Sequence, residues 1–330
     1  MGKLCRDGGM VDAHDSKSCL ARGGGSSPLP GTMKKKVLII VGPTASGKSS
    51  LGVRLAKKFN GEIISADSRQ VYKGLNVGSG KVTKKEMSGI THHLLDVANP
   101  KKRFSASDYK KLGDKAIQQI IKKNKLPIIV GGTGFYIDTL TGKMVLPEVP
   151  PNPKLRKYLE SKTVEELFNF LKKKDSKRAK TIDKKNKVRL IRALEIIESL
   201  GQVPNVKPRG SNIYEYIYVG VNPKKEILEK LIYKRLLARI PGMIREAKRL
   251  KANKLSYRRM EELGLEYRYL ARLLQNKLTK KAFLEELYKE IKHYSKRQMT
   301  WFRRNKKIKW FSSAEFASIQ RYLEGLKGGL

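Results

Sequence analysis

Cysteine is nearly absent from the 330-residue chain, which has only Cys5 and Cys19. Both lie close to the amino terminus, so the rest of the chain can form neither a disulfide framework nor a cysteine-ligated zinc site. A protein of this size with so little cysteine is typical of a reducing compartment. We therefore expect it to be cytoplasmic.

Long hydrophobic runs are also missing. The longest purely aliphatic run, Val37–Val41, is far shorter than the roughly 20 residues that a helix needs to cross a bilayer. We therefore predict no membrane-spanning segment. Although a membrane surface is weighed below as a partner, we do not expect one.

Acidic residues are scarce: 30 Asp and Glu stand against 72 Lys and Arg, for a net charge of +42. A small anion as the sole partner does not require so large an excess. The charge favours nucleic acid as the first partner to consider and an anionic membrane surface as the second. Histidine is rare too. His92 and His93 have no further His or Cys nearby to complete a metal site, so we interpret them as structural.

Residues 1–32 lack the hydrophobic periodicity of the remaining chain and carry four basic residues against three Asp. They contain no apolar core of a signal peptide. Gly25–Pro28 can be encoded by the T-arm of a tRNA gene, and Met10–Asp12 by an A-box-like sequence. We therefore expect that the reading frame starts too early, inside a tRNA gene, and that Met33 is the true start. The alternative is a natural disordered tail, and the DNA upstream of the Met33 codon distinguishes the two.

From Met33 onward, apolar strand patterns alternate with helical ones, which predicts an α/β fold with a mostly parallel sheet and a P-loop NTPase-like core. Four prolines between Pro147 and Pro153 mark a boundary. Residues 150–204 follow a purely helical pattern and are predicted to form a helical insertion. The core then comprises residues 33–149 and 205–330, and its last hundred residues are predicted to be basic helices. The predicted strands are 37–41, 63–66, 127–130 and 216–219.

The segment Gly42-x-x-x-x-Gly47-Lys48-Ser49 follows the first strand and precedes a helical pattern, which predicts a phosphate-binding loop. Glycines let backbone N–H groups surround an anion, and the helix presents its positive end to it. Lys48 can reach phosphate oxygens, and Ser49 supplies a hydroxyl to Mg²⁺. The predicted phosphate-binding residues are Thr44, Ala45, Ser46, Gly47, Lys48 and Ser49.

The usual companions of nucleotide hydrolysis are mostly missing. The strand 127–130 ends in Gly131-Gly132-Thr133, where a Walker-B strand would end in an acid that helps to hold Mg²⁺. An acid, Asp67, instead follows the second strand. Because the carboxyl ends of parallel strands meet at one edge of a sheet, we expect Asp67, Thr133 and the loop to surround one cavity. The alternative role of Asp67 is to cap its own turn.

Six blocks of the sequence, spread from about Lys36 to Phe311, are more specific than the phosphate loop alone. They stand in the order found in tRNA dimethylallyltransferases, so the chain resembles that family. The blocks are Gly42–Ser49, Ser65–Gly74, His92–Asp96, Gly131–Tyr136, Arg189–Glu195 and Lys296–Trp301.

The resemblance implies a monomeric enzyme that moves a dimethylallyl group from dimethylallyl diphosphate to N6 of the adenosine 3′ of the anticodon, position 37, in tRNA. It also implies that Asp67 is the general base and that Thr133 and Arg235 act with Lys48, Ser49 and Mg²⁺ on the departing diphosphate. The sequence around Arg235 matches loosely. Its alternative role is that of a solvated charge on a helix.

The resemblance further implies that the insertion, residues 150–204, binds tRNA, and it places contacts with the tRNA anticodon stem-loop. The residues implied are Asp67, Ser68, Arg69, Gln70, Arg156, Val188, Arg189, Leu190, Ile191, Arg192, Arg259, Gly264, Lys296 and Arg297. Aromatic residues among cations, such as Trp301, suit stacking on RNA bases, but they equally suit the buried face of a helix. The segment Leu263–Arg268 and the pair Lys292-His293 depart from the family pattern, which leaves the exact contacts there open.

Two other functions fit parts of the pattern. One is a P-loop small-molecule kinase that uses ATP, with Asp67 activating a hydroxyl. The other is a non-catalytic RNA-binding protein. The Gly-Gly-Thr strand end and the basic insertion favour prenyl transfer over the kinase. The ordered set of Lys48, Asp67 and Thr133 favours it over binding alone.

Overall fold

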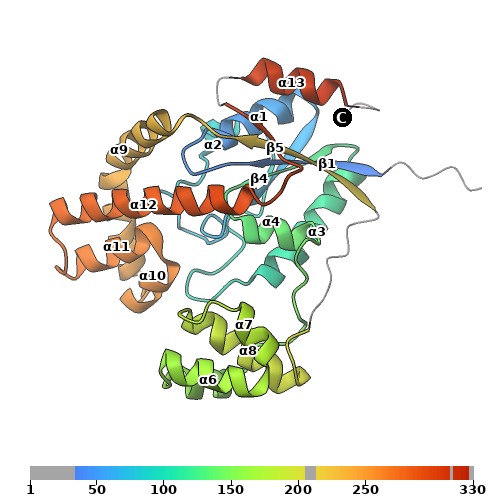
Figure 1. Ribbon diagram of the computed structural model, residues 1–330. Helices are drawn as coiled ribbons and strands as arrows, with labels where there is room; N and C mark the ends of the chain where they lie inside the picture. The colour runs from blue at the N-terminus through green and yellow to red at the C-terminus, as the bar shows by residue number, and fades with distance from the viewer. Residues whose placement is uncertain (1–33, 205–212, 313–314, 327–330) are drawn as a thin grey trace, which may run out of the picture. The chain divides into compact units, whose positions relative to one another are not determined.

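The computed structural model describes residues 34–204, 213–312 and 315–326. The predictions for residues 1–32, including the start at Met33, lie outside the described residues. The described chain forms a six-stranded sheet in which every pairing is parallel, in the order β3-β2-β4-β1-β5-β6 (Figure 1). The strands are β1 Lys35–Val41, β2 Gly61–Ala66, β3 His92–His93, β4 Leu126–Gly131, β5 Tyr214–Val221 and β6 Lys309–Phe311.

The central strand β1 shows why the sheet is covered on both faces. Its side chains alternate between two hydrophobic clusters: Val37, Ile39 and Val41 pack into one, and Leu38 and Ile40 pack into the other. A parallel strand that is buried on both faces needs such a continuous apolar run. The four predicted strands and the α/β class are confirmed.

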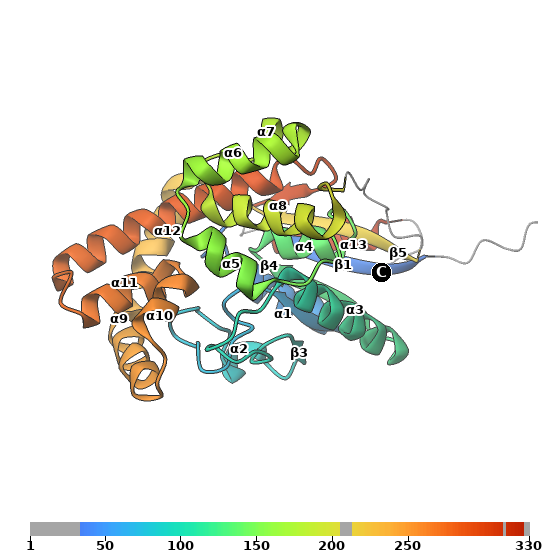
Figure 2. The ribbon, with the colours of Figure 1, turned by 90° about the horizontal axis from the view of Figure 1, so that it is seen from below.

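Helices of the core cover both faces of the sheet (Figures 1 and 2). One cluster contains side chains of α1 and α13, and the other contains side chains of α3, α4 and α9 to α12. A capping box formed by Ser105 and Asp108 begins α3. The core helices are α1 Lys48–Lys58, α2 Lys84–Met87, α3 Ala106–Lys122, α4 Gly134–Leu140, α9 Lys225–Ala252, α10 Tyr257–Leu263, α11 Leu265–Leu274, α12 Lys280–Phe302 and α13 Phe316–Glu324.

Residues 150–204 contain helices and no strand. These helices have a hydrophobic cluster of their own, with Leu167, Leu171 and Leu190 fully buried in it. A capping box at Thr163 begins one of the helices, and Gly201 with φ +76° ends another. The helices are α5 Pro153–Glu160, α6 Val164–Lys174, α7 Ser176–Thr181 and α8 Lys187–Leu200.

Two short strands differ from the predictions. The expectation of helices alone in the last hundred residues is wrong at β6, where Val221 pairs with Phe311 and extends the sheet beyond β5. The strand β3 is not among the predicted strands, and it pairs with Ile63 and Ile64 of β2. Strands of two or three residues are too short to show an alternating pattern, so only the pairing partner reveals them.

The interpretation of the histidine pair as structural agrees with their positions in β3. The ring of His93 lies with Nε2 2.7 Å from Oε2 of Glu62, a buried residue of β2. The ammonium groups of Lys123 and Lys125 lie 3.2 and 3.0 Å from the same carboxylate. Burial favours a raised pKa for Glu62, but the hydrogen bonds from His93, Lys125 and Lys123 outweigh it and lower the pKa to about 2.

This cluster predicts an acid-sensitive contribution to folding. The folded pKa of Glu62 lies below its unfolded value, so the stabilisation is complete above about pH 4.5 and is lost as the pH falls toward 2. Glu62→Gln should lower the free energy of unfolding by about 1.5–3 kcal/mol at pH 7. Urea unfolding of the wild type and the variant from pH 7 to pH 3 measures this difference in the free energy of unfolding, which should become smaller below pH 4.5. Glu165→Gln, at an exposed helix position, is the control. A gap independent of pH would contradict the assignment.

Candidate active site

The phosphate loop connects β1 to α1 and has the backbone that its glycines allow. Gly42 and Gly47 have φ of +153° and +87°, which residues with a side chain rarely adopt. A Cβ on Gly42 would also lie 2.3 Å from the carbonyl oxygen of Val221, at the end of β5. The glycine spacing therefore serves both the turn and the close packing against the neighbouring strand.

The polar groups of the loop are arranged for an anion. The hydroxyl of Ser46 is buried and has no hydrogen-bond partner among the described residues. The ammonium of Lys48 donates to the carbonyl of Pro43 at 2.5 Å. Burial, together with the nearby charge of Arg235, lowers the pKa of Lys48 to about 7, although Asp67 acts in the opposite direction. A bound phosphate would supply the negative charge and the acceptors that these groups lack.

The ends of β2 and β4 are joined beside this loop. The backbone N–H of Ser68 donates to Oγ1 of Thr133 at 3.1 Å, and the N–H of Thr133 donates to the carbonyl of Ala66 at 3.1 Å. Asp67 lies between these two contacts in the sequence. The structure thus brings Asp67 and Thr133 together at the carboxyl edge of the sheet, where the phosphate loop also begins.

The carboxylate of Asp67 does cap its own turn. Its Oδ1 accepts the backbone N–H groups of Arg69 at 2.8 Å and Gln70 at 3.2 Å. Its Oδ2 has no hydrogen-bond partner among the described residues. One oxygen therefore fixes the orientation of the carboxylate and the other remains able to accept a proton, so the two roles considered for Asp67 are compatible.

Arg235, on α9, lies close to the phosphate loop. Its guanidinium donates to the carbonyl of Gly80 at 3.1 Å and lines a narrow pocket with Thr44, Ala45 and Glu266. Burial and the neighbouring Arg239 lower the pKa of Arg235. The side chain is accessible to water yet surrounded by protein, as expected for a group that lines a crevice. Arg235 is therefore more than a solvated charge on the outer face of a helix.

A buried carboxylate outside the predicted site holds the loop beneath Arg235. Glu246 accepts the backbone N–H groups of Asn76, Val77 and Gly78 at 2.8, 2.7 and 2.9 Å, and the hydroxyl of Tyr267 at 2.8 Å. Arg239 bonds the carbonyls of the same loop. Glu246 and Arg239 thus fix the backbone to which Arg235 is anchored. The only signal in the sequence is an acid within a strongly basic helix.

Gln298, on α12, links the two halves of the site and is also absent from the predicted residues. Its Oε1 accepts the N–H of Thr44 in the phosphate loop at 2.8 Å, and its Nε2 donates to the carbonyl of Gly132 at 2.9 Å. A Cβ on Gly132 would lie 2.1 Å from that nitrogen, so a side chain at position 132 would displace the amide of Gln298. The one available signal is the position of Gln298 inside the Lys296–Trp301 block.

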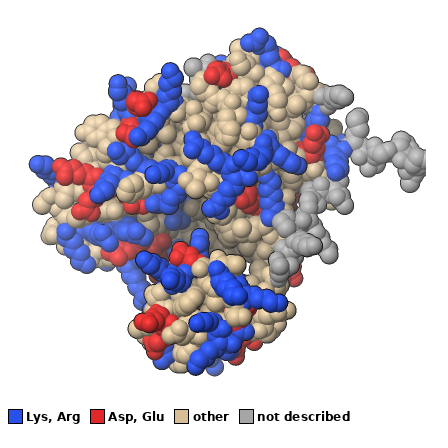
Figure 3. All heavy atoms as spheres, viewed as in Figure 1, with Lys and Arg blue, Asp and Glu red and all other residues tan. Residues whose placement is uncertain are grey.

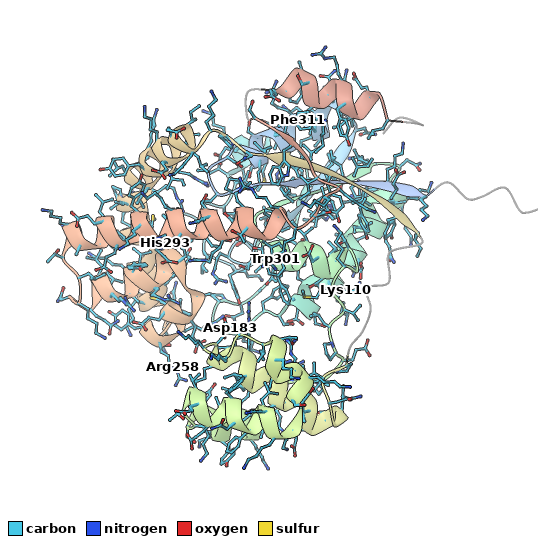
Figure 4. All side chains as sticks on the ribbon, viewed as in Figure 1. Lys110, Asp183, Arg258, His293, Trp301 and Phe311 are labelled. Atoms are coloured by element: carbon cyan, nitrogen blue, oxygen red, sulfur yellow. The ribbon has the colours of Figure 1, made fainter. Side chains whose placement is uncertain are left out.

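Trp301 lies one turn further along the same helix, where α12 meets α4 (Figure 4). Its indole N–H donates to the carboxylate of Asp138 at 2.8 Å, and its ring lies edge-on to Phe135 at 6.3 Å. Burial raises the pKa of Asp138, and the hydrogen bond from Trp301 opposes that rise. The indole N–H of Trp301 is thus bonded within the protein. This favours the interpretation of Trp301 as part of the buried face of a helix over a role in stacking on RNA bases.

The predicted RNA contacts of the core fall into two groups. Arg69 and Gly264 are neighbours, because a Cβ on Gly264 would lie 3.5 Å from Nη2 of Arg69. The guanidinium of Arg259 is instead engaged by the protein. It donates to the carbonyls of Pro100 and Lys102 and is paired with Glu262. Arg259 therefore supports the loop 100–102.

The predicted RNA contacts of the insertion also divide into residues bonded within the protein and residues exposed at the surface. Arg156 makes two bonds of 2.6 and 2.7 Å to the buried Glu195, and Arg192 contacts that carboxylate at 3.4 Å. Leu190 and Ile191 are buried. By contrast, Val188 is 76% exposed, and Arg189 is exposed as well. Within the segment 188–192, these two residues are therefore the ones placed to contact RNA.

In the core, Lys296 and Arg297, near the carboxyl end of α12, are both exposed.

On the face shown in Figure 3, Lys and Arg are more prominent than Asp and Glu, and they border the hollow at its centre. No helix in the described part of the chain is long and apolar enough to cross a membrane. Within residues 34–204, 213–312 and 315–326, no group of three or more His, Cys, Asp or Glu could hold a metal ion. Magnesium needs no such group, because it commonly binds through one or two protein ligands, substrate phosphates and water. Ser49, exposed at the start of α1, fits that mode.

A parallel sheet with a glycine-rich phosphate loop between its first strand and first helix defines an α/β protein of the P-loop class. Residues 70–305 match the family model for IPP transferase. The chain belongs to the IPP transferase family.

Relatives are similar over nearly their whole length. The tRNA dimethylallyltransferase of Pediococcus pentosaceus is 38% identical over 89% of this chain and 97% of its own. The tRNA dimethylallyltransferase 2 of Treponema denticola is 40% identical over 83% of this chain and 93% of its own. Among solved structures, the tRNA isopentenylpyrophosphate transferase of Bacillus halodurans has a TM-score of 0.67 at 32% identity, covering 88% of this chain and 96% of that one. A eukaryotic dimethylallyltransferase acting on tRNA has a TM-score of 0.76 at 26% identity, covering 90% and 80%.

Proposed function

We propose that the chain transfers a dimethylallyl group from dimethylallyl diphosphate to N6 of adenosine 37, immediately 3′ of the anticodon in tRNA, and releases diphosphate. The observation that carries the proposal is the meeting of the phosphate loop with Asp67, Thr133 and Arg235 at one edge of the sheet. The strand β4 has no acid at its end, in keeping with a loop that holds a leaving group. The full-length relatives named tRNA dimethylallyltransferase support the same reaction.

The loop and its cations act on the leaving group. As the allylic C–O bond breaks, its electron pair stays on the diphosphate, and negative charge grows on that oxygen. The ammonium of Lys48, the guanidinium of Arg235 and the N–H groups of the loop stabilise this charge. Ser49 would hold Mg²⁺ against the diphosphate, and the ion would supply further neutralising charge.

Asp67 acts on the nucleophile. The lone pair of the adenine N6 is delocalised into the ring, so the amine attacks well only as it loses a proton. As the new N–C bond forms, Oδ2 of Asp67 accepts that proton, while Oδ1 stays bonded to the turn. Oγ1 of Thr133 accepts the N–H of Ser68, and its own O–H can donate to the departing diphosphate, the role that the family resemblance implies.

The RNA has to present a base that is normally stacked. An enzyme that modifies the ring of a nucleotide takes that nucleotide out of the stack, which requires a firm grip on the surrounding loop. The net charge of +42 suits contacts with several phosphates. We propose that one protein molecule acts on one anticodon stem-loop, with Arg69, Val188 and Arg189 among its contacts.

One experiment distinguishes the candidate functions. The protein is incubated with unmodified tRNA and Mg²⁺, with either dimethylallyl diphosphate or ATP, and the nucleosides are then analysed by mass spectrometry. The expected result is a dimethylallyl mass gain on one adenosine, with dimethylallyl diphosphate only. Phosphate release from ATP without any gain on tRNA would indicate a kinase. Binding of tRNA without either reaction would indicate a non-catalytic protein.

A further inference from the structure

A second pocket, of about 720 Å³, lies away from the phosphate loop. It is formed by the loop that continues from the Asp67–Gln70 turn, by the loop 97–101 and by the carboxyl end of α9, and these loops lie beside α9 and α10 in Figure 2. Its volume is within the range of pockets that bind small ligands or single nucleotides. No role in the reaction described above uses it.

The pocket offers hydrogen-bond donors and positive charge. Three cations line it, Lys73, Lys101 and Arg249, and no Asp or Glu does. Two amide side chains in the lining have their oxygens engaged by the protein: Oδ1 of Asn76 accepts from Lys81, and Oδ1 of Asn99 accepts from the backbone of Lys101. Their amide N–H groups stay available. Such a lining suits an anion rich in acceptors, above all a phosphate.

The backbone around the pocket is fixed by several hydrogen bonds. The N–H of Lys73 donates to the carbonyl of Ala98 at 2.9 Å, and Arg249 donates to the carbonyl of Gly74 at 3.2 Å. From the other side, Arg259 holds the carbonyls of Pro100 and Lys102. The buried Leu250 and Leu255 give the pocket an apolar floor. A nucleotide would suit this lining, with its phosphate at the cationic rim and its sugar or base on the apolar floor.

We propose that this pocket is a second RNA subsite, which takes a nucleotide of the anticodon arm through its phosphate, outside the reaction crevice. The inference rests on the proposed function, because the RNA that reaches Asp67 is the same one. Lys73 follows Gln70 by three residues, a span of at most about 11 Å. The pocket therefore lies within reach of RNA that contacts the Asp67–Gln70 turn.

The test uses the double variant Lys73→Ala/Lys101→Ala, since both side chains are exposed and neither ammonium has a partner among the described residues. The matched control is Lys57→Ala/Lys122→Ala, two exposed lysines in the last turns of α1 and α3. Binding of unmodified tRNA is measured by fluorescence anisotropy across a salt series, with prenyl transfer in parallel. The pocket variant should bind about 10-fold more weakly, with the salt slope reduced by about 1 to 2.

Further measurements distinguish an RNA subsite from a general charge effect and from a site for a free ligand. The KM for dimethylallyl diphosphate and kcat at saturating tRNA should stay unchanged in the pocket variant, and Lys73→Glu/Lys101→Glu should weaken tRNA binding further. Equal effects of the pocket and control variants would overturn the subsite. Binding of adenosine 5′-monophosphate or inorganic phosphate that the variant loses, with unchanged tRNA affinity, would assign the pocket to a free ligand instead. If the wild-type protein does not prenylate tRNA, the proposed function is wrong. If the wild type prenylates tRNA and the pocket variant binds tRNA as tightly as the wild type, only the inference of a second subsite is wrong.

Discussion

Asp67→Ala should lower the rate of prenyl transfer by about 10²- to 10⁴-fold, the usual contribution of a general base. The reason is the free Oδ2 of a carboxylate whose Oδ1 is already held by the N–H groups of Arg69 and Gln70. Without it, no described carboxylate at the end of β2 accepts the N6 proton. Single-turnover transfer to tRNA at saturating dimethylallyl diphosphate measures the chemical step, and anisotropy with unmodified tRNA measures binding.

Asp67→Asn is the matched control for the turn. The amide oxygen of Asn can accept the same two N–H groups, so the turn keeps its cap, but the amide cannot take a proton. If Asp67 is the base, both variants lose the chemical step while tRNA binding changes little. If it serves only the turn, the Asn variant should retain most of the activity. Equal losses of rate and binding in both variants would make Asp67 an RNA contact alone.

The central part of this site could be predicted because its signals are local. The phosphate loop, the acid after β2 and the Gly-Gly-Thr turn after β4 each follow an apolar run long enough to be recognised as a strand. Once those strands are parallel, their carboxyl ends meet at one edge. Position in the sequence then implies position in space, without any knowledge of side-chain contacts.

The supporting residues could not be predicted, because their partners are distant in the sequence. Gln298 lies 254 residues from Thr44, and Glu246 lies 168 to 170 residues from the N–H groups it accepts. A polar residue on a helix looks the same whether it faces water or a buried backbone group. Only the packing of α9 and α12 against the core separates the two.

Basic residues that contact RNA are hard to predict for a different reason. The chain contains many Lys and Arg residues, and the sequence does not distinguish those that meet RNA from the others. Arg156, Arg192 and Arg259 stand in segments that the family resemblance assigns to tRNA, yet each bonds a carboxylate or a carbonyl within the protein. Those bonds commit their donors to holding loops and helices together. Exposed side chains such as Val188 and Arg189 are better placed to meet RNA. Composition indicates the class of partner, and geometry selects the contacts.

Gln298→Glu should lower kcat/KM for dimethylallyl diphosphate by about 10²-fold, the scale on which small displacements of a reacting geometry act. The Glu side chain keeps an oxygen for the N–H of Thr44. It replaces the donor to Gly132 with a second oxygen, 2.9 Å from that carbonyl in the native arrangement. It also adds negative charge beside the loop that holds the diphosphate. The loop and the Thr133 turn should therefore move apart.

Gln298 is a positioning residue, so the measurement has to separate positioning from general damage. Steady-state kinetics should show the loss mainly in the KM for dimethylallyl diphosphate, with the KM for tRNA nearly unchanged. Ser295→Ala, at a buried position of α12 one turn earlier, is the matched control and should leave both constants near those of the wild type. If Gln298 merely packs the helix, Gln298→Met should preserve activity, and Gln298→Glu should raise both KM values together with a fall in the thermal unfolding midpoint. Loss in both variants, confined to the diphosphate substrate, is the result expected of an amide that spans the two halves of the site.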